Sequence, residues 1–222
     1  MRAGILFFLT LLALEKYSGK EANPGNIAAP DRIEVQETEE LTKDSGNYHS
    51  PVPFERFWKV NPDIIGWISI DGTNIDYPVV QAEDNTKYLT ASYDGTENPA
   101  GAVFLDYDCE HDFLGKHNII YGHNMKDGSM FHDLVNFKKE SYYRNHQIIT
   151  VYTPGKEIHL RPVAVVCTEA DGIRRRTDFF NMTAFDEYVE TMLEGGLYRE
   201  EQESDITRDR KSTRLNSSHL EQ

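Results

Sequence analysis

Short apolar runs separated by turn-forming residues dominate the middle of the chain. Runs rich in Ile, Val, Tyr and Phe are typical of β-strands. Two pairs of runs flank Asp71-Gly72 and Pro154-Gly155, dipeptides that favour tight turns, so each pair is predicted to form a hairpin. The predicted strands cover residues 64–70, 75–80, 102–107, 118–121, 148–153 and 157–167.

Segments with helical character interrupt these strands. In the last of them the apolar residues share one helical face, Thr183 is the expected N-cap, and Gly195-Gly196 follows the end. Strands with turn signals, interrupted by helices, predict a mainly β fold in the form of a β-barrel with inserted helices. The predicted helices cover residues 54–60, 84–89, 129–137 and 184–194.

The N-terminus carries an apolar run at residues 5–14, which is short of the roughly 20 residues that span a bilayer. We therefore expect residues 1–17 to be an export signal or an uncleaved signal anchor, placing the protein on the extracellular face of the cell membrane. A buried N-terminal helix is the less favoured alternative, because the polar residues 18–53 that follow are typical of a linker.

The net charge of −14 makes the phosphate backbone of nucleic acid an improbable partner. The only basic run is Arg174-Arg175-Arg176, which we expect in a solvated loop.

His123 lies where an apolar run ends, in the segment Tyr121-Gly122-His123-Asn124-Met125. A histidine at a strand end can hold one ring face by packing and present the other to a cleft, as general acid/base catalysis requires. An isolated histidine of this kind would more often be a surface residue. The sequence around His123 therefore has to decide between a surface role and a catalytic role. A metal site that joins it to other histidines is possible from residue type alone, but no ligand spacing demands one and no metal is predicted. The other histidines considered, which have no motif support, are His111, His117 and His132.

Several separated segments together resemble the class B sortases, the cell-surface cysteine transpeptidases of Gram-positive bacteria. The resemblance covers roughly residues 54–200, and the domain is expected at 54–207. It implies an eight-stranded β-barrel with an N-terminal helical extension and a helix between the sixth and seventh strands. The segments that carry it are Asn61-Pro-Asp-Ile-Ile-Gly-Trp67, Ile75-Asp-Tyr-Pro-Val-Val-Gln81, Asp84-Asn85, Tyr88-Leu89, Gly101-Ala-Val-Phe-Leu-Asp106, Tyr121-Gly-His-Asn-Met125, Gly128-Ser-Met-Phe131 and Tyr152-Thr-Pro154.

The resemblance also implies a reaction and its partners. Class B sortases cut a sorting signal similar to Asn-Pro-x-Thr-Asn after its threonine, through a thioester on a cysteine. An amine of a cell-wall precursor then takes the cargo protein. A histidine carries protons, an arginine supports the oxyanion, and no organic cofactor is needed.

Four residues match functional positions of the family. His123 matches the catalytic histidine, and Tyr121 is expected to support the site beside it. Asn85 and Leu89 match positions that line the signal-peptide groove. A helix cap is the alternative role for Asn85, and a core leucine is the alternative for Leu89.

The family's Thr-Leu-x-Thr-Cys motif and the arginine that follows it are absent. Cys167 falls at the end of the predicted sixth strand and Cys109 in the loop before His123, so both are predicted to be non-catalytic. Residues 208–222 show no strand pattern and look non-native, so the last two strands are expected to be missing. We therefore expect an inactive, poorly soluble chain with an open barrel; a surface protein that binds sorting signals without catalysis is the alternative.

Overall fold

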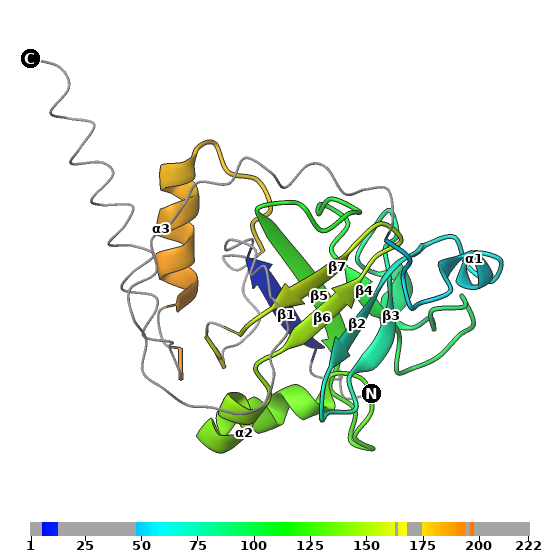
Figure 1. Ribbon diagram of the computed structural model, residues 1–222, viewed down its shortest axis with the longest axis horizontal. Coiled ribbons are helices and arrows are strands. Elements are labelled where there is room, and N and C mark those ends of the chain that lie inside the picture. Colours follow the sequence, from blue (N-terminus) through cyan, green and yellow to red (C-terminus); the bar gives the residue numbers. More distant parts are fainter. Residues whose placement is uncertain (1–5, 13–47, 163, 168–174, 194–195, 198–222) are drawn as a thin grey trace, which may run out of the picture.

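One seven-stranded sheet organises the chain, in the order β1-β5-β4-β3-β2-β6-β7 (Figure 1). The computed structural model describes residues 6–12, 48–162, 164–167, 175–193 and 196–197. Strands β3 and β4 are parallel, and every other neighbouring pair is antiparallel. The strands are β1 (Leu6–Leu12), β2 (Ile64–Ile70), β3 (Asp76–Val80), β4 (Val103–Leu105), β5 (His117–His123), β6 (Ile149–Tyr152) and β7 (Glu157–Leu160).

Short helical segments cover the two faces of this sheet. They are α1 (Phe54–Phe57), η1 (Lys87–Leu89), η2 (His132–Lys138), α2 (Glu140–Asn145) and α3 (Met182–Leu193). The main core joins one face of the sheet to η2 and α2, and includes Leu105, Ile120 and Phe131. The other face packs against α1 and η1 through Phe104 and other residues of a second core. Since neighbours on a strand alternate between faces, β4 contributes to both cores.

The main core depends on a glycine in the strand that ends at His123. A Cβ built on Gly122 would lie 2.6 Å from a ring carbon of Phe131, so η2 can approach β5 this closely only over a glycine.

Replacing Gly122 with alanine is therefore expected to lower the free energy of unfolding by about 1–3 kcal/mol, because the Phe131 ring must move out of a packed core. Urea unfolding measures the loss. Gly155→Ala is the matched control, since nothing lies within 4 Å of a Cβ there. Equal stability of the two variants would contradict the prediction.

The predicted mainly β fold is confirmed, with β2, β3 and the hairpin they form near their expected bounds and the second hairpin, β6 with β7, in its expected place. Three local predictions were wrong. The strand at 157–167 stops at Leu160, because Pro162 cannot donate a ladder hydrogen bond. Helix α2 was not foreseen. The side chain of Asn181, and not Thr183, accepts the hydrogen bond from Ala184 N at the start of α3.

The described residues test the predicted signal segment, linker and C-terminal tail only in small part. Part of the expected signal segment, Leu6–Leu12, forms strand β1 along β5. Among the described residues, no helix has the length and apolar character needed to cross a membrane. Most of the expected linker, the tail at 208–222 and the place of the last two strands lie outside the described residues.

Candidate active site

β5 ends at His123, and the loop after it folds straight back. The Phe131 amide donates to the His123 carbonyl at 2.9 Å, and Asn124 and Met130 form an isolated bridge. Met130 has φ 58°, a left-handed conformation that a non-glycine residue adopts only at a cost in free energy. A tight, strained loop thus fixes the backbone position of His123, as the sequence predicted for a histidine at a strand end.

The His123 ring is half-buried beside a second polar residue of the same strand. Its Nε2 is shielded from solvent and has no hydrogen-bond partner among the described residues. Tyr121 precedes it by two positions, so both side chains lie on the same face of β5, roughly 7 Å apart along the strand. A shielded ring nitrogen without a partner is unusual, and a catalytic role is one of the explanations for such an atom.

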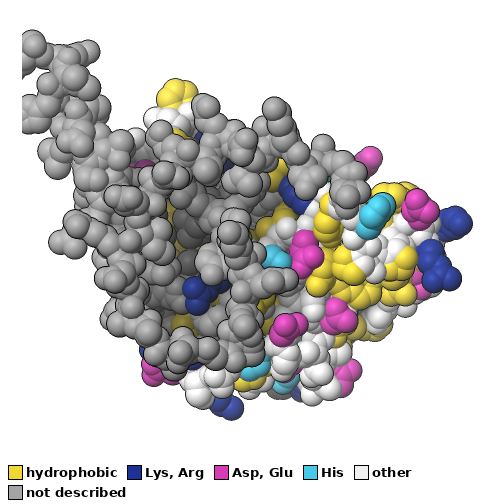
Figure 2. Space-filling model, in the orientation of Figure 1, with side chains coloured by type: hydrophobic (Ala, Val, Ile, Leu, Met, Phe, Trp, Pro, Cys, Tyr) yellow, Lys and Arg dark blue, Asp and Glu magenta, His cyan; other side chains and the backbone are white. Residues whose placement is uncertain are grey.

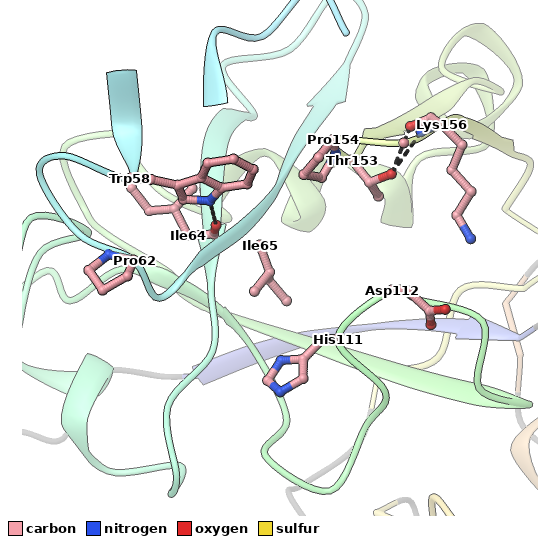
Figure 3. A pocket seen from close by; sticks show the side chains of 10 residues that line it. Trp58, Pro62, Ile64, Ile65, His111, Asp112, Thr153, Pro154 and Lys156 are labelled. Atoms are coloured by element: carbon pink, nitrogen blue, oxygen red, sulfur yellow. Dashed lines mark hydrogen bonds between the residues drawn. The ribbon is translucent and has the colours of Figure 1, made fainter. Parts of the chain in front are cut away.

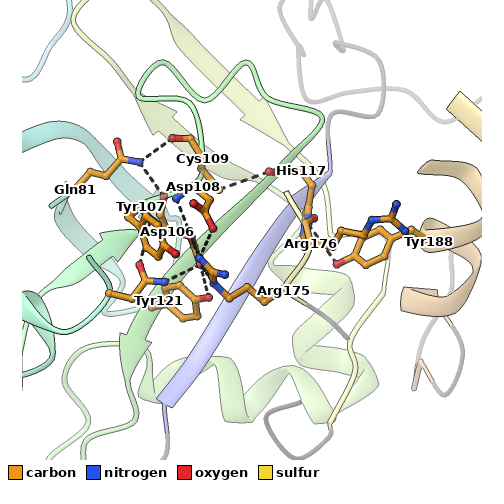
Figure 4. A network of polar contacts seen from close by, with 11 residues as sticks. Gln81, Asp106, Tyr107, Asp108, Cys109, His117, Tyr121, Arg175, Arg176 and Tyr188 are labelled. Atoms are coloured by element: carbon orange, nitrogen blue, oxygen red, sulfur yellow. Dashed lines mark hydrogen bonds and ion pairs between the residues drawn. The ribbon is translucent and has the colours of Figure 1, made fainter. Parts of the chain in front are cut away.

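Asp106 lies at the centre of the polar contacts next to Tyr121 (Figure 4). Its side chain is fully buried. The Tyr121 hydroxyl donates to its Oδ2 at 2.7 Å, and Asn85 Nδ2 donates to the same oxygen at 2.9 Å. The structure therefore brings together two of the four predicted site residues, through a carboxylate that was not predicted to belong to the site.

An arginine from the segment before α3 completes this cluster. Arg175 Nε donates to Asp106 Oδ2 and one terminal nitrogen donates to Oδ1, both at 2.7 Å, in a bidentate pair. It also reaches Asp108 at 2.6 Å. Arg175 and Arg176 lie in a loop, as predicted for this basic run, but the ion pair of Arg175 with the buried carboxylate was not foreseen.

The cluster sets the charge states of its members. Burial on its own raises the pKa of Asp106, but hydrogen bonds from Arg175, the Asp108 amide, Tyr121 and Asn85 outweigh it, so the pKa is lowered. Burial and the neighbouring Asp106 carboxylate raise the pKa of Tyr121. At neutral pH the site therefore holds a carboxylate and a neutral phenol, and Tyr121 cannot serve as a base.

Asn85 and Leu89 come from the segment around η1. Asn85 does not cap that helix: the N-cap position is Thr86, and the amides of Thr86 and Lys87 donate to the Asp84 side chain. Instead, Asn85 Oδ1 accepts from the Tyr107 amide at 3.1 Å, which fixes the orientation of its side-chain amide. Leu89 is half-buried against the second core, so packing accounts for much of its position.

A cleft of about 580 Å³ opens elsewhere on the described surface, and none of the predicted site residues lines it (Figure 3). Figure 2 shows hydrophobic side chains gathered on the side of the molecule that carries α1. The walls of the cleft come from the start of β2, the turn between β6 and β7, and the loop after β4. The lining residues are Trp58, Pro62, Ile64, Ile65, His111, Asp112, Thr153, Pro154, Gly155 and Lys156.

Comparison with known proteins identifies the family. A sortase B of Listeria monocytogenes is 36% identical over 140 residues, which make up 63% of this chain and 57% of that protein. A sortase B of Staphylococcus aureus is 32% identical over 142 residues, 64% of this chain and 58% of that protein. The solved Listeria monocytogenes sortase B superposes with a TM-score of 0.61 at 33% identity, covering 67% of this chain and 85% of that chain.

The chain belongs to the class B sortases. No family model matches it. It spans 57% and 58% of the length of the two relatives named above, so this sortase chain represents little more than half of each.

The two cysteines of this sortase chain lie in different surroundings, and neither contacts His123 among the described residues. Cys109 is buried, and its thiol donates to the His117 carbonyl at 3.6 Å. His117 begins β5 and His123 ends it, so roughly 20 Å of strand separates these two histidines, and Cys109 lies beside His117. Cys167 is exposed.

Thiol labelling of the folded chain at pH 8 is expected to modify Cys167 first and Cys109 about 100-fold more slowly. Burial raises the pKa of the Cys109 thiol from 9.0 to about 11, which lowers its reactive thiolate fraction by that order. Mass spectrometry after timed exposure to iodoacetamide measures both rates. In guanidinium the two cysteines should react alike, and fast labelling of Cys109 without denaturant would contradict the assigned burial.

Two of the other histidines considered, His117 and His132, have structural contacts. His117 is buried, its Nδ1 lies 2.7 Å from the Arg176 carbonyl, and its ring packs on Tyr188. His132 Nδ1 lies 2.8 Å from the side-chain oxygen of Asn124. Within the described ranges, no group of three His, Cys, Asp or Glu side chains is placed to hold a metal ion.

Proposed function

We propose that this site binds a sorting-signal peptide similar to Asn-Pro-x-Thr-Asn and that His123 carries protons in a cysteine transpeptidase reaction. The observation that carries the proposal is the placement of His123, whose shielded Nε2 lies on the same face of β5 as the Tyr121 and Asn85 cluster. A Staphylococcus aureus sortase B bound to a substrate has a related fold, with a TM-score of 0.63 at 28% identity, covering 69% of this chain and 71% of that chain.

In this reaction a cysteine thiolate attacks the carbonyl carbon of the signal's threonine. The bond to the next residue breaks, and the histidine donates a proton to the departing amine. An amine of a cell-wall precursor then attacks the thioester, the histidine removes a proton from it, and the thiol is regenerated. The product is a cargo protein joined to the cell wall. We place this chemistry on the extracellular face of the membrane of a Gram-positive cell, with the N-terminus as the attachment.

The 222 residues alone are not expected to turn over substrate. Cys109 is a neutral thiol at pH 7, and the length of β5 separates it from His123. Cys167 is exposed and has no contact with His123 among the described residues. The nucleophile and the oxyanion-supporting arginine are therefore proposed to be supplied by sequence beyond these residues.

Binding and cleavage of one fluorescent Asn-Pro-x-Thr-Asn peptide test the proposal. The 222-residue chain should bind the peptide in an anisotropy titration without cleaving it. A chimera that continues after residue 207 with the C-terminal segment of the Listeria monocytogenes sortase B should cleave it. A scrambled peptide is the control. No binding by the chain and no cleavage by the chimera would refute the assignment of this site.

A surface protein that binds sorting signals without cutting them is the second candidate function. The contacts of the cluster support it for the 222-residue chain, since Asn85 and Tyr121 need no nucleophile to hold a peptide. Sequencing the gene beyond the codon for Arg210 discriminates the two: a downstream Thr-Leu-x-Thr-Cys frame supports the enzyme, and a stop after Gln222 supports the binding protein.

A further inference from the structure

Two groups of the proposed peptide site share one buried acceptor. Asn85 Nδ2 and the Tyr121 hydroxyl both donate to Asp106 Oδ2, so these two atoms lie less than about 6 Å apart. They come from separate elements, the loop before η1 and the end of β5. Nothing else in the described contacts joins Asn85 to Tyr121 directly.

We propose that Asp106 is a positioning residue that presents Asn85 and Tyr121 to the backbone of the bound peptide. The inference rests on the proposed function. Asp106 itself is fully buried and does not reach the peptide; it acts through the two side chains that donate to it.

The hydrogen-bond pattern fixes what each side chain offers. The Tyr121 proton is held by Asp106, so the phenol oxygen presents its lone pairs and accepts from a peptide N–H. Asn85 uses one amide proton on Asp106, and its oxygen accepts from the Tyr107 amide. Its second amide proton is left for a peptide carbonyl. One acceptor and one donor side by side match the two polar groups of a peptide backbone.

Arg175 keeps the carboxylate in place and charged. Its bidentate pair uses both Asp106 oxygens, and the Tyr107 ring lies 4.9 Å from its guanidinium carbon. The side chain comes from the segment before α3, so its pair with Asp106 connects this late part of the chain to the peptide site.

Affinity of the 222-residue chain for the fluorescent signal peptide tests the inference. Asp106→Asn is expected to weaken binding about 10-fold, since it places an amide where donors from four residues converge. Asp106→Glu keeps the charge but displaces the carboxylate, and should weaken binding by a similar factor in a chain that stays folded. Asp63→Asn is the matched control: this aspartate also pairs with a lysine and accepts from a tyrosine, Lys87 and Tyr88, and the variant should bind within about 2-fold of wild type.

A double-mutant cycle separates positioning from a merely structural role. If Asp106 acts through Asn85, Asn85→Ala should weaken wild type but have little further effect in the Asp106→Glu background. Independent, additive losses would overturn the inference, and so would wild-type affinity of Asp106→Glu. If wild type itself does not bind the peptide, the proposed function has failed instead.

Discussion

Replacing His123 with alanine in the chimera is expected to lower the rate of signal-peptide cleavage by about 10²–10⁴-fold, with little change in peptide affinity. A positioned general acid/base typically contributes a factor of this size. The imidazole is proposed to donate the proton that the departing amine needs, whereas Asn85 and Tyr121 are proposed to hold the peptide. Steady-state cleavage of the fluorescent peptide measures the rate, and anisotropy with the His123→Ala 222-residue chain measures the affinity.

His111→Ala is the control for this experiment, because His111 lines the separate cleft and not the candidate active site. Its cleavage rate should equal that of the unaltered chimera. Retention of full activity by His123→Ala would show that His123 is not the residue that transfers protons in this reaction.

Replacing Asp106 with alanine is expected to lower the free energy of unfolding by about 3–5 kcal/mol. The substitution leaves Arg175 without its bidentate partner and leaves the Tyr121 hydroxyl and the Asn85 amide without their acceptor. Each buried donor left without its acceptor costs about 1–3 kcal/mol, and Arg175, which is partly exposed and still pairs with Asp108, adds less. Urea unfolding at pH 7 measures it, and a loss below about 1 kcal/mol would show that the cluster adds little to stability.

The difference in unfolding free energy between wild type and Asp106→Ala is expected to depend on pH. The pKa of Asp106 is lowered in the folded protein, so its stabilising contribution is complete above the pKa of an unfolded aspartate, about 3.9. It is lost as the pH falls through the folded-state pKa. The stability difference between wild type and Asp106→Ala should therefore be constant from pH 7 to about pH 5 and shrink at lower pH. A difference that grows on acidification would contradict the assigned ion pair.

Local pattern predicted those parts of the fold that depend on neighbours in sequence. The hairpin around Asp71-Gly72 joins two apolar runs, and Gly72 adopts the positive φ that the turn needs. His123 was placed at a strand end because an apolar run stops there. Helix α2 was missed because its six residues carry no repeating apolar face.

The centre of the polar cluster depends on contacts between distant residues. Asp106 and Arg175 are 69 positions apart, and neither spacing nor periodicity links them. One signal was available: Asp106 directly follows the apolar run Val103-Phe104-Leu105, and a carboxylate at the buried end of a strand requires partners. The identity of the cation could not have been inferred, since the neighbouring arginines at 174 and 176 have the same side chain.

The long separation between Asp106 and Arg175 also orders the steps of folding during synthesis. A nascent chain that has emerged as far as β7 already holds all seven strands, yet its buried carboxylate still lacks the guanidinium that neutralises it. N-terminal parts fold first as a chain is made, so the sheet can assemble before the cluster can close. The segment that carries Arg175 would then convert a preassembled sheet with an unneutralised carboxylate into one whose peptide-facing side chains have fixed orientations.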